Sequence, residues 1–515
     1  MKNHLLFSII SISFFFNWTQ GQTYPKISSS TNAFGVYTED NHPVYYDKDL
    51  NRVLFVHRKS VDWNGFPDAN SGSIQGTWSD NNGQTWDSTI FWTDGINLAR
   101  YPNGIIANPA GNTNPGNALI AGCGPTTSGS GWNGSWFSSG TFSPAAIQNQ
   151  GEQFIPLQQP SQGALTLSQM SFPRANMCYA NGSVYTLGKL YSDANTLTTF
   201  RGVALLKGTV NNGNIAWSLV DSIIPNVLVN SSGIKQIDES VRMSFSPNGQ
   251  VAYIVFLGAD ANAQPGTPQF GYQPIVYKSI QGGISGSWQH VLGNYDWISN
   301  HSQISQFLSA YGTIRPNFTD NYGWDVTVDN QNRLNVACMI RSGVNTQSVD
   351  TVDYSYNYVF DISNPGNSLA YIYHAYTDGV NCWKLSVLDT SYSDYASSSS
   401  ASAWYDSGGG STFQNHRLQI SRNTSGDKLM FSWVDDHTNI SALYNPDLYI
   451  KGYSSVTGLY SPTQQKTTRG DIFYHYFSPI MMENTPTTGS LASPGIFTVS
   501  KNQTFDNNQP VEYYY

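Results

Sequence analysis

The strongest constraint in this 515-residue sequence is a hairpin unit that recurs along almost the whole chain. Each copy consists of an apolar stretch of period two, a polar turn built on Asn, Asp or Gly, and a second apolar stretch. A period of two is typical of β-strands, and stretches with the i, i+3, i+4 spacing of helices are scarce. The copies lie at 44–56, 105–121, 175–187, 242–256, 326–340, 418–434 and, more weakly, 477–499.

The spacing of these copies favours a ring of small sheets. The turn centres lie roughly 60 to 100 residues apart, which suits one four-stranded antiparallel sheet per copy with long loops. Small sheets repeated around an axis form a β-propeller, where each sheet covers its neighbours and ring closure removes the ends. We predict an all-β, seven-bladed β-propeller, with six blades as the alternative. The strand-like residues 34–38 are expected to close the ring beside 511–515.

The first 21 residues have the pattern of a secretory signal. Lys2 precedes an apolar run at 5–16, and small residues precede Gln22. The run of about 12 residues is too short to span a bilayer, which needs roughly 20, and no later segment is longer. We predict a secreted or cell-surface protein with no membrane span, whose residues 22–515 form a single propeller domain.

Two further features bear on the domain organisation. The Ser- and Gly-rich stretch at 391–412 predicts a surface insertion. The strand-like ending at 511–515 predicts either a last strand that docks into the fold or a native chain that continues beyond it.

Composition excludes several classes of protein. Charged residues make up only 11% of the chain and aromatic residues 14%, with a formal net charge of −9. Acidic disordered chains lack apolar groups to bury, and helical bundles need more Ala, Glu, Lys and Leu. The 25 basic residues are scattered, so no nucleic-acid-binding surface is predicted.

The four cysteines contain no Cys-x-x-Cys pair, so a zinc ribbon is not expected. Two possibilities stay open: four buried thiols, or one or two disulfides formed on export. The residues are Cys123, Cys178, Cys338 and Cys382.

The residues just ahead of the hairpins suggest a binding site at one end of the central channel. In a ring, these positions approach one another, and most of them are basic. An Arg fork is suited to a carboxylate or sulfate, although each side chain could instead pair with a neighbouring carbonyl or acid. The predicted ligand-binding set is His42, Arg100, Arg174, Arg242, Asp325 and Arg417, with His475 in the equivalent place of the last copy.

Two other candidate sites are weaker. Trp132 and Trp136 could stack on sugar rings, or they could pack in the core. Asp62, Asn64 and Asp68 offer oxygen donors that suit calcium, but they lack EF-hand spacing, so turn hydrogen bonding is the alternative. No other cofactor is predicted.

One motif resembles a known family. Ser79, Gly83, Thr85 and Trp86 match the pattern Ser-x-Asp-x-Gly-x-Thr-Trp, with Asn81 in place of Asp. This resembles the Asp-box of bacterial neuraminidase (BNR) repeats and implies a sialidase-like propeller. A blurred second copy runs over 279–288. The box is structural in that family, and the Arg-Ile-Pro segment of sialidases is absent, so the resemblance brings no activity with it. The signal region also resembles those of proteins exported by Bacteroidetes-type bacteria.

These observations predict a secreted propeller that binds an extracellular glycan or a surface protein, with no assignable catalysis. The first alternative is a polysaccharide lyase or glycoside hydrolase that acts on acidic sugars. A lyase needs a His or Tyr base and a cation for the uronate, and the candidates are His416, His475 and Arg417. The second alternative is a structural or adhesive surface component.

Overall fold

The structure is a computed structural model of the whole chain. It describes residues 24–31, 35–36, 41–60, 72–129, 131–148, 153–157, 175–193, 198–211, 213–229, 235–262, 272–291, 314–319, 323–345, 356–358, 371–378, 383–390, 417–435, 447–468, 472–483, 491–500 and 510–515. Several predictions concern residues outside these ranges: the signal at 1–21, the insertion at 391–412, Arg174, His416, Cys382, and the calcium candidates Asp62, Asn64 and Asp68.

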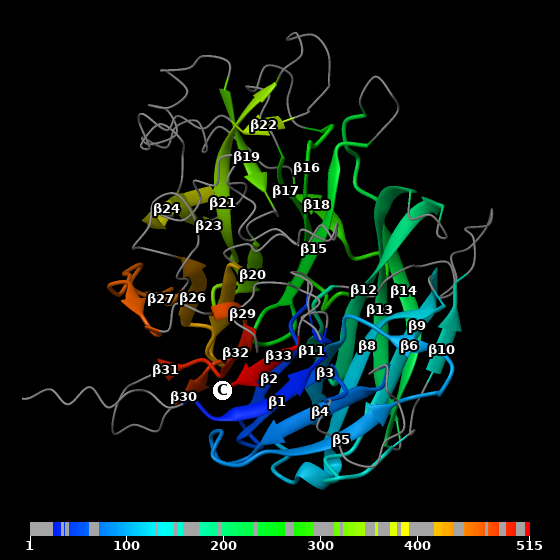
Figure 1. Ribbon diagram of the computed structural model, residues 1–515. Helices are drawn as coiled ribbons and strands as arrows, with labels where there is room; N and C mark the ends of the chain where they lie inside the picture. Colours follow the sequence, from blue (N-terminus) through cyan, green and yellow to red (C-terminus); the bar gives the residue numbers. More distant parts are fainter. Residues whose placement is uncertain are drawn as a thin grey trace, which may run out of the picture.

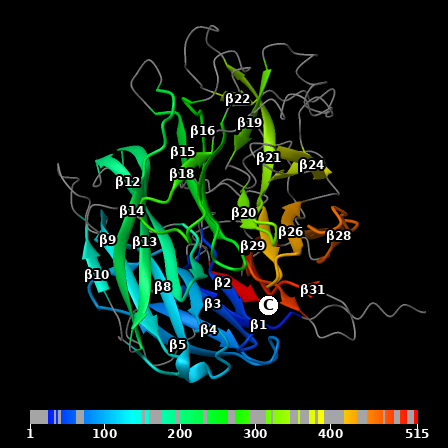
Figure 2. The ribbon, with the colours of Figure 1, turned by 180° about the vertical axis from the view of Figure 1, so that it is seen from behind.

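The described strands form seven antiparallel sheets around a central axis, which confirms the seven-bladed propeller (Figures 1 and 2). The strands of each blade are given from the axis outward. Blade one contains β2 (Val44–Asp47), β3 (Arg52–Arg58), β4 (Ile74–Ser79) and β5 (Asp87–Trp92), and blade two contains β7 (Asn103–Ala107), β8 (Leu119–Ser128), β9 (Gly131–Gly140) and β10 (Gln153–Pro156). Blade three contains β11 (Cys178–Ala180), β12 (Ser183–Asp193), β13 (Thr198–Asn211) and β14 (Asn214–Ile223). Blade four contains β15 (Ile237–Phe245), β16 (Ala252–Gly258), β17 (Gln273–Ser279) and β18 (Gln289–Val291). Blade five contains β20 (Asp325–Val328), β21 (Leu334–Asn345), β23 (Tyr371–Thr377) and β24 (Trp383–Thr390), and blade six contains β25 (Gln419–Arg422), β26 (Lys428–Asp435), β27 (Asp447–Ser454) and β28 (Gln464–Gln465).

The seventh blade combines the two ends of the described chain, with β29 (Ile472–Phe477), β32 (Gly495–Ser500), β33 (Val511–Tyr514) and β1 (Lys26–Ser30). Short strands extend two of these sheets: β6 (Leu98–Ala99) pairs with β8, and β19 (Ile314–Thr319) and β22 (Tyr356–Tyr358) pair with β21. A separate two-stranded sheet is formed by β30 (Met482–Glu483) and β31 (Leu491–Ala492). In the part of the chain that the structure describes, no helix has the length and apolar character needed to cross a bilayer.

Six of the seven hairpins predicted from the sequence are the two innermost strands of their blades; the seventh, at 477–499, includes most of β32 but only the last residue of β29. Their strongly apolar character follows from this position, because these strands are covered by neighbouring blades on both faces. In β3, for example, all seven residues are buried, and the same holds for β16. The outer strands carry more exposed residues, so their signal in the sequence is weaker.

The ring closes as predicted, but with a different N-terminal strand. The segment that pairs with β33 is β1, where Ser30 lies opposite Val511, and the Lys26 ammonium lies 2.9 Å from the Glu512 carboxylate. The prediction of 34–38 as the closing strand was wrong. Val36 is fully buried but lies in a turn, so its apolar character reflects burial and not strand pairing.

Side chains on the innermost strands bind each blade to the next. Asn103 accepts a hydrogen bond from the His42 backbone N–H (3.0 Å) and donates one to the Ala175 carbonyl (2.9 Å). One residue thereby connects blades one, two and three. In the next seam, Asn176 accepts from the Met243 N–H at 3.0 Å.

The same kind of contact continues around the ring. Between blades four and five, the Arg242 Nε donates to the Trp324 carbonyl (3.0 Å), and between blades five and six, Asp325 accepts from the Ile420 N–H (2.9 Å). Between blades six and seven, Gln419 accepts from the Phe477 N–H (2.8 Å), and between blades seven and one, the Ser478 hydroxyl accepts from the Tyr46 N–H (2.9 Å). All seven seams therefore carry a side-chain-to-backbone hydrogen bond. We call these residues the hub ring: Asn103, Asn176, Arg242, Asp325, Gln419 and Ser478.

The loop that carries the Asp-box pattern connects β4 to β5. The Ser79 hydroxyl accepts from the Gly83 N–H (2.8 Å), the Asn81 side chain accepts from the Thr85 N–H (2.9 Å), and the Trp86 indole donates to the Gly83 carbonyl (3.1 Å). Asn81 thus forms the turn contact that the pattern assigns to Asp. Gly83 has φ +83°, which favours glycine.

The second copy of this pattern lies at the equivalent place in blade four, between β17 and β18. There the Ser279 hydroxyl accepts from the Gly283 N–H at 3.1 Å. The two loops share a Ser-to-Gly hydrogen bond, and membership of the BNR family stays a prediction.

Three of the four cysteines are free thiols in the structure: Cys123, Cys178 and Cys338. Burial raises the pKa of Cys123 and of Cys178 to about 12, and it also raises the pKa of Cys338. These groups therefore remain protonated at neutral pH, where the reactive thiolate is scarce.

We predict that removing one hub-ring side chain destabilises the whole propeller. Asn103→Ala leaves the His42 N–H and the Ala175 carbonyl buried without these partners, which costs about 2–4 kcal/mol of unfolding free energy. Equilibrium urea unfolding measures this change. The exposed Asn214→Ala is the control and should shift the free energy by less than about 0.5 kcal/mol. Equal shifts in the two variants would contradict the role of the ring.

A pH dependence follows from two buried histidines. Burial lowers the pKa of His57 to about 4 and that of His374 to about 3. An unfolded histidine takes up its proton near pH 6.5, so the unfolded state binds more protons as the pH falls below that value. Stability is therefore fully present above about pH 6.5 and declines toward pH 4.

The variant His57→Gln tests this expectation. We expect the slope of unfolding free energy against pH, between pH 6 and 4.5, to fall by about 1 kcal/mol per pH unit relative to the wild type. An unchanged slope would show that His57 is not held neutral in the folded state.

Candidate functional site

The propeller has two faces that differ in the residues they present. We call the face where the innermost strands begin the N-face, and the face where they end the C-face. Because neighbouring strands are antiparallel, the second strand of each blade ends at the N-face. The N-face therefore combines the starts of β7, β11, β15, β20 and β25 with the ends of β3, β8, β12, β16 and β26.

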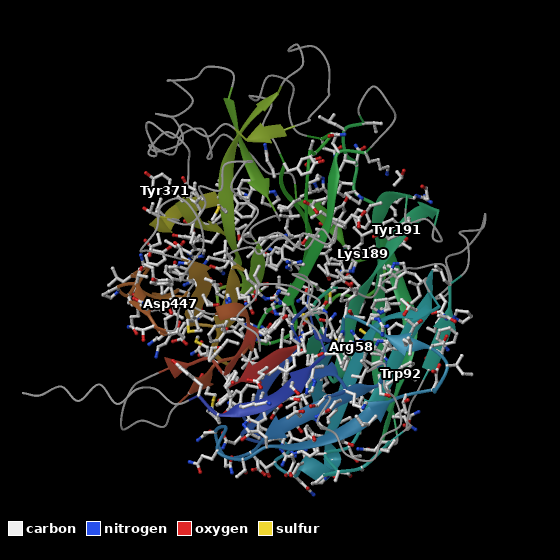
Figure 3. All side chains as sticks on the ribbon, viewed as in Figure 1. Arg58, Trp92, Lys189, Tyr191, Tyr371 and Asp447 are labelled. Carbon is white, nitrogen blue, oxygen red and sulfur yellow. The ribbon has the colours of Figure 1, made fainter. Side chains whose placement is uncertain are left out.

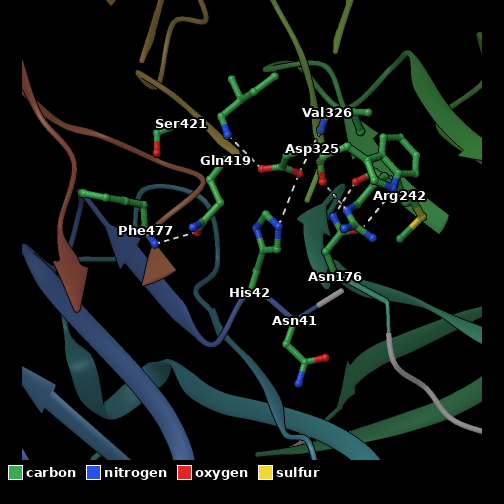
Figure 4. Close-up of polar contacts among 12 residues, drawn as sticks. Asn41, His42, Asn176, Arg242, Asp325, Val326, Gln419, Ser421 and Phe477 are labelled. Atoms are coloured by element: carbon green, nitrogen blue, oxygen red, sulfur yellow. Dashed lines mark hydrogen bonds and ion pairs between the residues drawn. The ribbon is translucent and has the colours of Figure 1, made fainter. Parts of the chain in front are cut away.

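The axis is blocked by polar side chains near the N-face (Figure 4). His42 of blade one reaches Asp325 of blade five, with 3.3 Å between Nε2 and Oδ1, and both side chains are buried. Arg417, just ahead of β25, donates to the Asn41 carbonyl at 3.0 Å. These contacts cross the ring, because blade one is not adjacent to blade five or to blade six. We call Asn41, His42, Asp325 and Arg417 the axial plug.

The structure thus brings together three of the residues predicted to bind an anion: His42, Asp325 and Arg417. The surroundings of the arginines differ from an open anion site. Arg242 is fully buried, donates to the Ser240 hydroxyl at 2.9 Å, and lies 4.9 Å from the centre of the Trp324 ring. This matches the alternative left open by the sequence, where Arg pairs with neighbouring loop groups.

His475 is buried in β29 beside the plug. Burial, together with the nearby Arg417 guanidinium, lowers the pKa of His475 well below its ordinary value. Arg417 itself stacks on the Tyr476 ring, 4.1 Å from its centre. The neutral His475 is thus buried in the fold.

The two tryptophans proposed for sugar stacking have different positions. Trp136 is fully buried against Trp92, with ring centres 5.7 Å apart, so it presents no face to a sugar and this prediction was wrong. All residues of β9 from Gly134 to Gly140 are buried, so both faces of the strand are covered at Trp136. Trp132 lies at the N-face start of β9, is half-buried, and has its ring 5.8 Å from that of Tyr101.

Tyr101 was not singled out in the sequence, but its backbone is unusual. It has φ +43°, a left-handed conformation that is rare for a bulky residue and often marks a functional site. Gly323 and Arg417 also have positive φ, and each of the three precedes a hub-ring residue by two positions. Tyr101 therefore occupies a repeated bend at the start of an innermost strand, next to the half-buried Arg100, whose guanidinium donates to the Ala99 carbonyl.

A second group that the sequence did not reveal lies at the seam between blades three and four. The Tyr191 hydroxyl, near the end of β12, donates a hydrogen bond of 2.7 Å to the Glu239 carboxylate of β15. Lys189 precedes Tyr191 by two residues in β12, so the alternation of a strand places the two side chains on one face; the two residues are labelled close together in Figure 3. Both side chains are only 3% exposed. We call Lys189, Tyr191 and Glu239 the tyrosine–carboxylate site.

The tyrosine–carboxylate site adjoins the aromatic pair of blade two. Tyr191 belongs to an apolar cluster with Phe200, whose ring lies edge-on at 5.8 Å, and Trp132 packs against the same cluster. Chemically, a phenol bonded to a carboxylate can pass its proton to that carboxylate, and a nearby ammonium favours the resulting negative charge. The site can therefore move a proton or form a nucleophile.

No metal centre is found among the described residues, because no three His, Cys, Asp or Glu side chains there come close enough to share an ion. The calcium candidates Asp62, Asn64 and Asp68 lie outside these residues.

Comparisons with known proteins give only distant similarities. No family model and no curated protein matches the chain. Among solved structures, an ulvan lyase of a polysaccharide lyase family is similar with a TM-score of 0.46 and 9% identity, over 95% of this chain and 94% of that one. The polysaccharide lyase Uly1 gives 0.42 and 12%, over 97% and 93%. An exo-β-1,3-galactanase from Clostridium thermocellum gives 0.30 and 8%, over 70% and 60%. At these low values, no residue role is transferred.

We predict that Arg242 is structural. Arg242→Met keeps most of the volume but removes the hydrogen bonds to the Trp324 carbonyl and Ser240 hydroxyl, which costs about 1–3 kcal/mol of unfolding free energy. Chemical unfolding beside the exposed control Lys48→Met measures the difference. If Arg242→Met unfolded with the wild-type free energy, the guanidinium would not contribute to the seam.

Proposed function

We propose that this chain is an exported enzyme that cleaves an acidic polysaccharide by β-elimination at the tyrosine–carboxylate site. The observation that carries the proposal is the 2.7 Å hydrogen bond from Tyr191 to Glu239, formed across two blades on the N-face. An enzyme of this kind was the first alternative predicted from the sequence, which favoured a glycan-binding protein without catalysis.

The proposed reaction uses each group of the site once. The Tyr191 proton shifts to Glu239, and the phenolate oxygen takes the proton from the sugar carbon next to the uronate carboxylate. The electron pair of that C–H bond forms a carbon–carbon double bond, and the glycosidic C–O bond to the next carbon breaks. The new phenol then protonates the leaving oxygen, and the Glu239 proton returns to Tyr191. The products are a saturated end and an unsaturated end, with no net loss of atoms.

Lys189 supports this step electrostatically. Removal of a proton beside a carboxylate places a second negative charge on the uronate, and a cation at that carboxylate lowers the energy of this state. Lys189 lies on the same strand face as Tyr191, so one sugar residue can contact both. The low exposure of the two side chains places the ammonium in a medium where its charge acts more strongly than in water.

The neighbouring aromatic pair gives the polymer a place to bind. Tyr101 and Trp132 are half-buried at the N-face, and their rings form a tilted pair against which sugar C–H groups can stack. Arg100 adds a positive charge beside them. We place the sugars that flank the cleaved bond on this pair, in blade two, and the reacting uronate at blades three and four.

The experiment uses the chain from residue 22 onward with a panel of uronate polymers, both sulfated and unsulfated. Ultraviolet absorbance reports unsaturated ends, and a reducing-end assay reports total cleavage. We expect the two signals to rise together. Tyr191→Phe should lower kcat by about 10²–10⁴-fold, the range associated with loss of a positioned proton carrier.

A matched control separates catalysis from folding. Tyr514 donates a 2.6 Å hydrogen bond to Glu512 in the outer part of blade seven, so Tyr514→Phe removes a similar contact away from the N-face site. This variant should keep wild-type kcat.

The other outcomes each contradict elimination at this site. Reducing ends without absorbance would indicate a hydrolase with a tyrosine nucleophile, and retention of a polymer without cleavage would indicate a binding protein. Absence of both would leave a structural component. Full activity in Tyr191→Phe would exclude Tyr191 as the proton carrier.

A further inference from the structure

A second charged group lies on the axis at the opposite end from the axial plug. Arg422 is the last residue of β25 in blade six, and its guanidinium donates to the Phe245 carbonyl at the end of β15 in blade four, at 3.4 Å. Blade five lies between these two blades. A contact that skips a blade must pass on the axial side of the ring, so the guanidinium lies at the C-face end of the central channel.

Four blades meet around this guanidinium. Tyr45 of blade one and Cys178 of blade three are both close enough to interact with it electrostatically. Arg422, Tyr45 and Cys178 all keep some accessible surface although they lie on innermost strands. Solvent therefore reaches this part of the axis, in contrast to the buried axial plug.

Among the residues that the structure describes, no carboxylate is one of the groups that act on the charge of Arg422. The groups that act on it are the Tyr45 hydroxyl and the Cys178 thiol, both neutral at neutral pH, and burial lowers the pKa of Arg422. Asp47, which ends β2 on the same face, accepts hydrogen bonds at Oδ1 from the Leu50 N–H and the Asn108 amide, each at 3.0 Å. In the described part of the chain, no ion pair joins Asp47 to Arg422.

The hydrogen-bonding capacity of Arg422 is also largely unused. A guanidinium has five N–H donors, and the one side-chain hydrogen bond described for Arg422 is the long contact to Phe245. A half-buried cation with free donors can therefore gain by binding an anion of the right size.

We infer that Arg422 binds a small inorganic oxyanion, such as sulfate or phosphate, on the axis at the C-face. The planar fork of a guanidinium suits two oxygens of one tetrahedral anion, whereas chloride uses only one contact at a time. This axial anion site is separate from the tyrosine–carboxylate site in both face and blade, and it does not depend on the proposed enzymatic activity.

The experiment titrates sodium sulfate against sodium chloride at matched ionic strength and follows the melting temperature. Sulfate stabilises many proteins in a linear, non-specific manner, so the diagnostic signal is a saturable component. We expect this component in the wild type with sulfate, at least a tenfold loss of sulfate affinity in Arg422→Met, and a smaller loss in Arg422→Lys, which keeps the charge without the fork. Arg52→Met is the control, because Arg52 pairs with Asp80 at 3.3 Å away from the axis.

A direct location completes the test. Crystals soaked in selenate should show an anomalous peak beside Arg422 on the axis, in the wild type and not in Arg422→Met. Absence of a saturable component in the wild type, its persistence in Arg422→Met, or selenate bound elsewhere but not on the axis would each overturn the proposal. Should Arg422→Met not fold, Arg422→Lys and the wild-type selenate position still decide the question.

Discussion

The closed set of hydrogen bonds in the hub ring is the interaction on which the rest of this structure depends. Each blade is a small sheet whose innermost strand would leave backbone groups exposed to the axis. The hub ring satisfies these groups with side chains of the adjacent blade, as Asn103 does for the His42 N–H and the Ala175 carbonyl. Because both partners are buried, breaking one contact leaves polar groups without water or protein partners, which couples the seven blades.

This closure also decides where a ligand can bind. Near the N-face, the His42–Asp325 contact and Arg417 occupy the axis, so the channel does not run through the molecule. The chemistry that we propose on this face lies at a seam between blades, where Tyr191 donates a hydrogen bond to Glu239. At the C-face, the axis remains accessible around Arg422, and a different kind of ligand, a small anion, fits there.

The sequence predicted the fold well because the two innermost strands of a blade are covered on both faces, which makes them strongly apolar on either side of a polar turn. It placed the closing strand wrongly because a buried residue in a turn, Val36, looks the same as one in a strand. The repeat also predicted that His42 and Asp325 lie near the axis, but the sequence could not show that these two side chains contact each other. The assignment of Trp136 to a sugar site failed because both faces of β9 are covered at that position, so either register would bury it.

The Tyr191–Glu239 pair was beyond sequence reasoning for a specific reason. The two residues are 48 positions apart on different blades, and no spacing or motif connects them. Their contact depends on how blade three is seated against blade four, which is set by core packing and by the Asn176–Met243 hydrogen bonds. A contact of this kind can be recognised only from the three-dimensional structure of the two packed blades.

The most direct measurement for the proposed function is a crystal structure of Tyr191→Phe soaked with an acidic oligosaccharide. Our account predicts a sugar chain on the N-face across blades two to four, with a uronate carboxylate at Lys189, its adjacent carbon beside residue 191 and a neighbouring sugar on Trp132. An oligosaccharide bound on the C-face or on another seam, with the tyrosine–carboxylate site unoccupied, would contradict it.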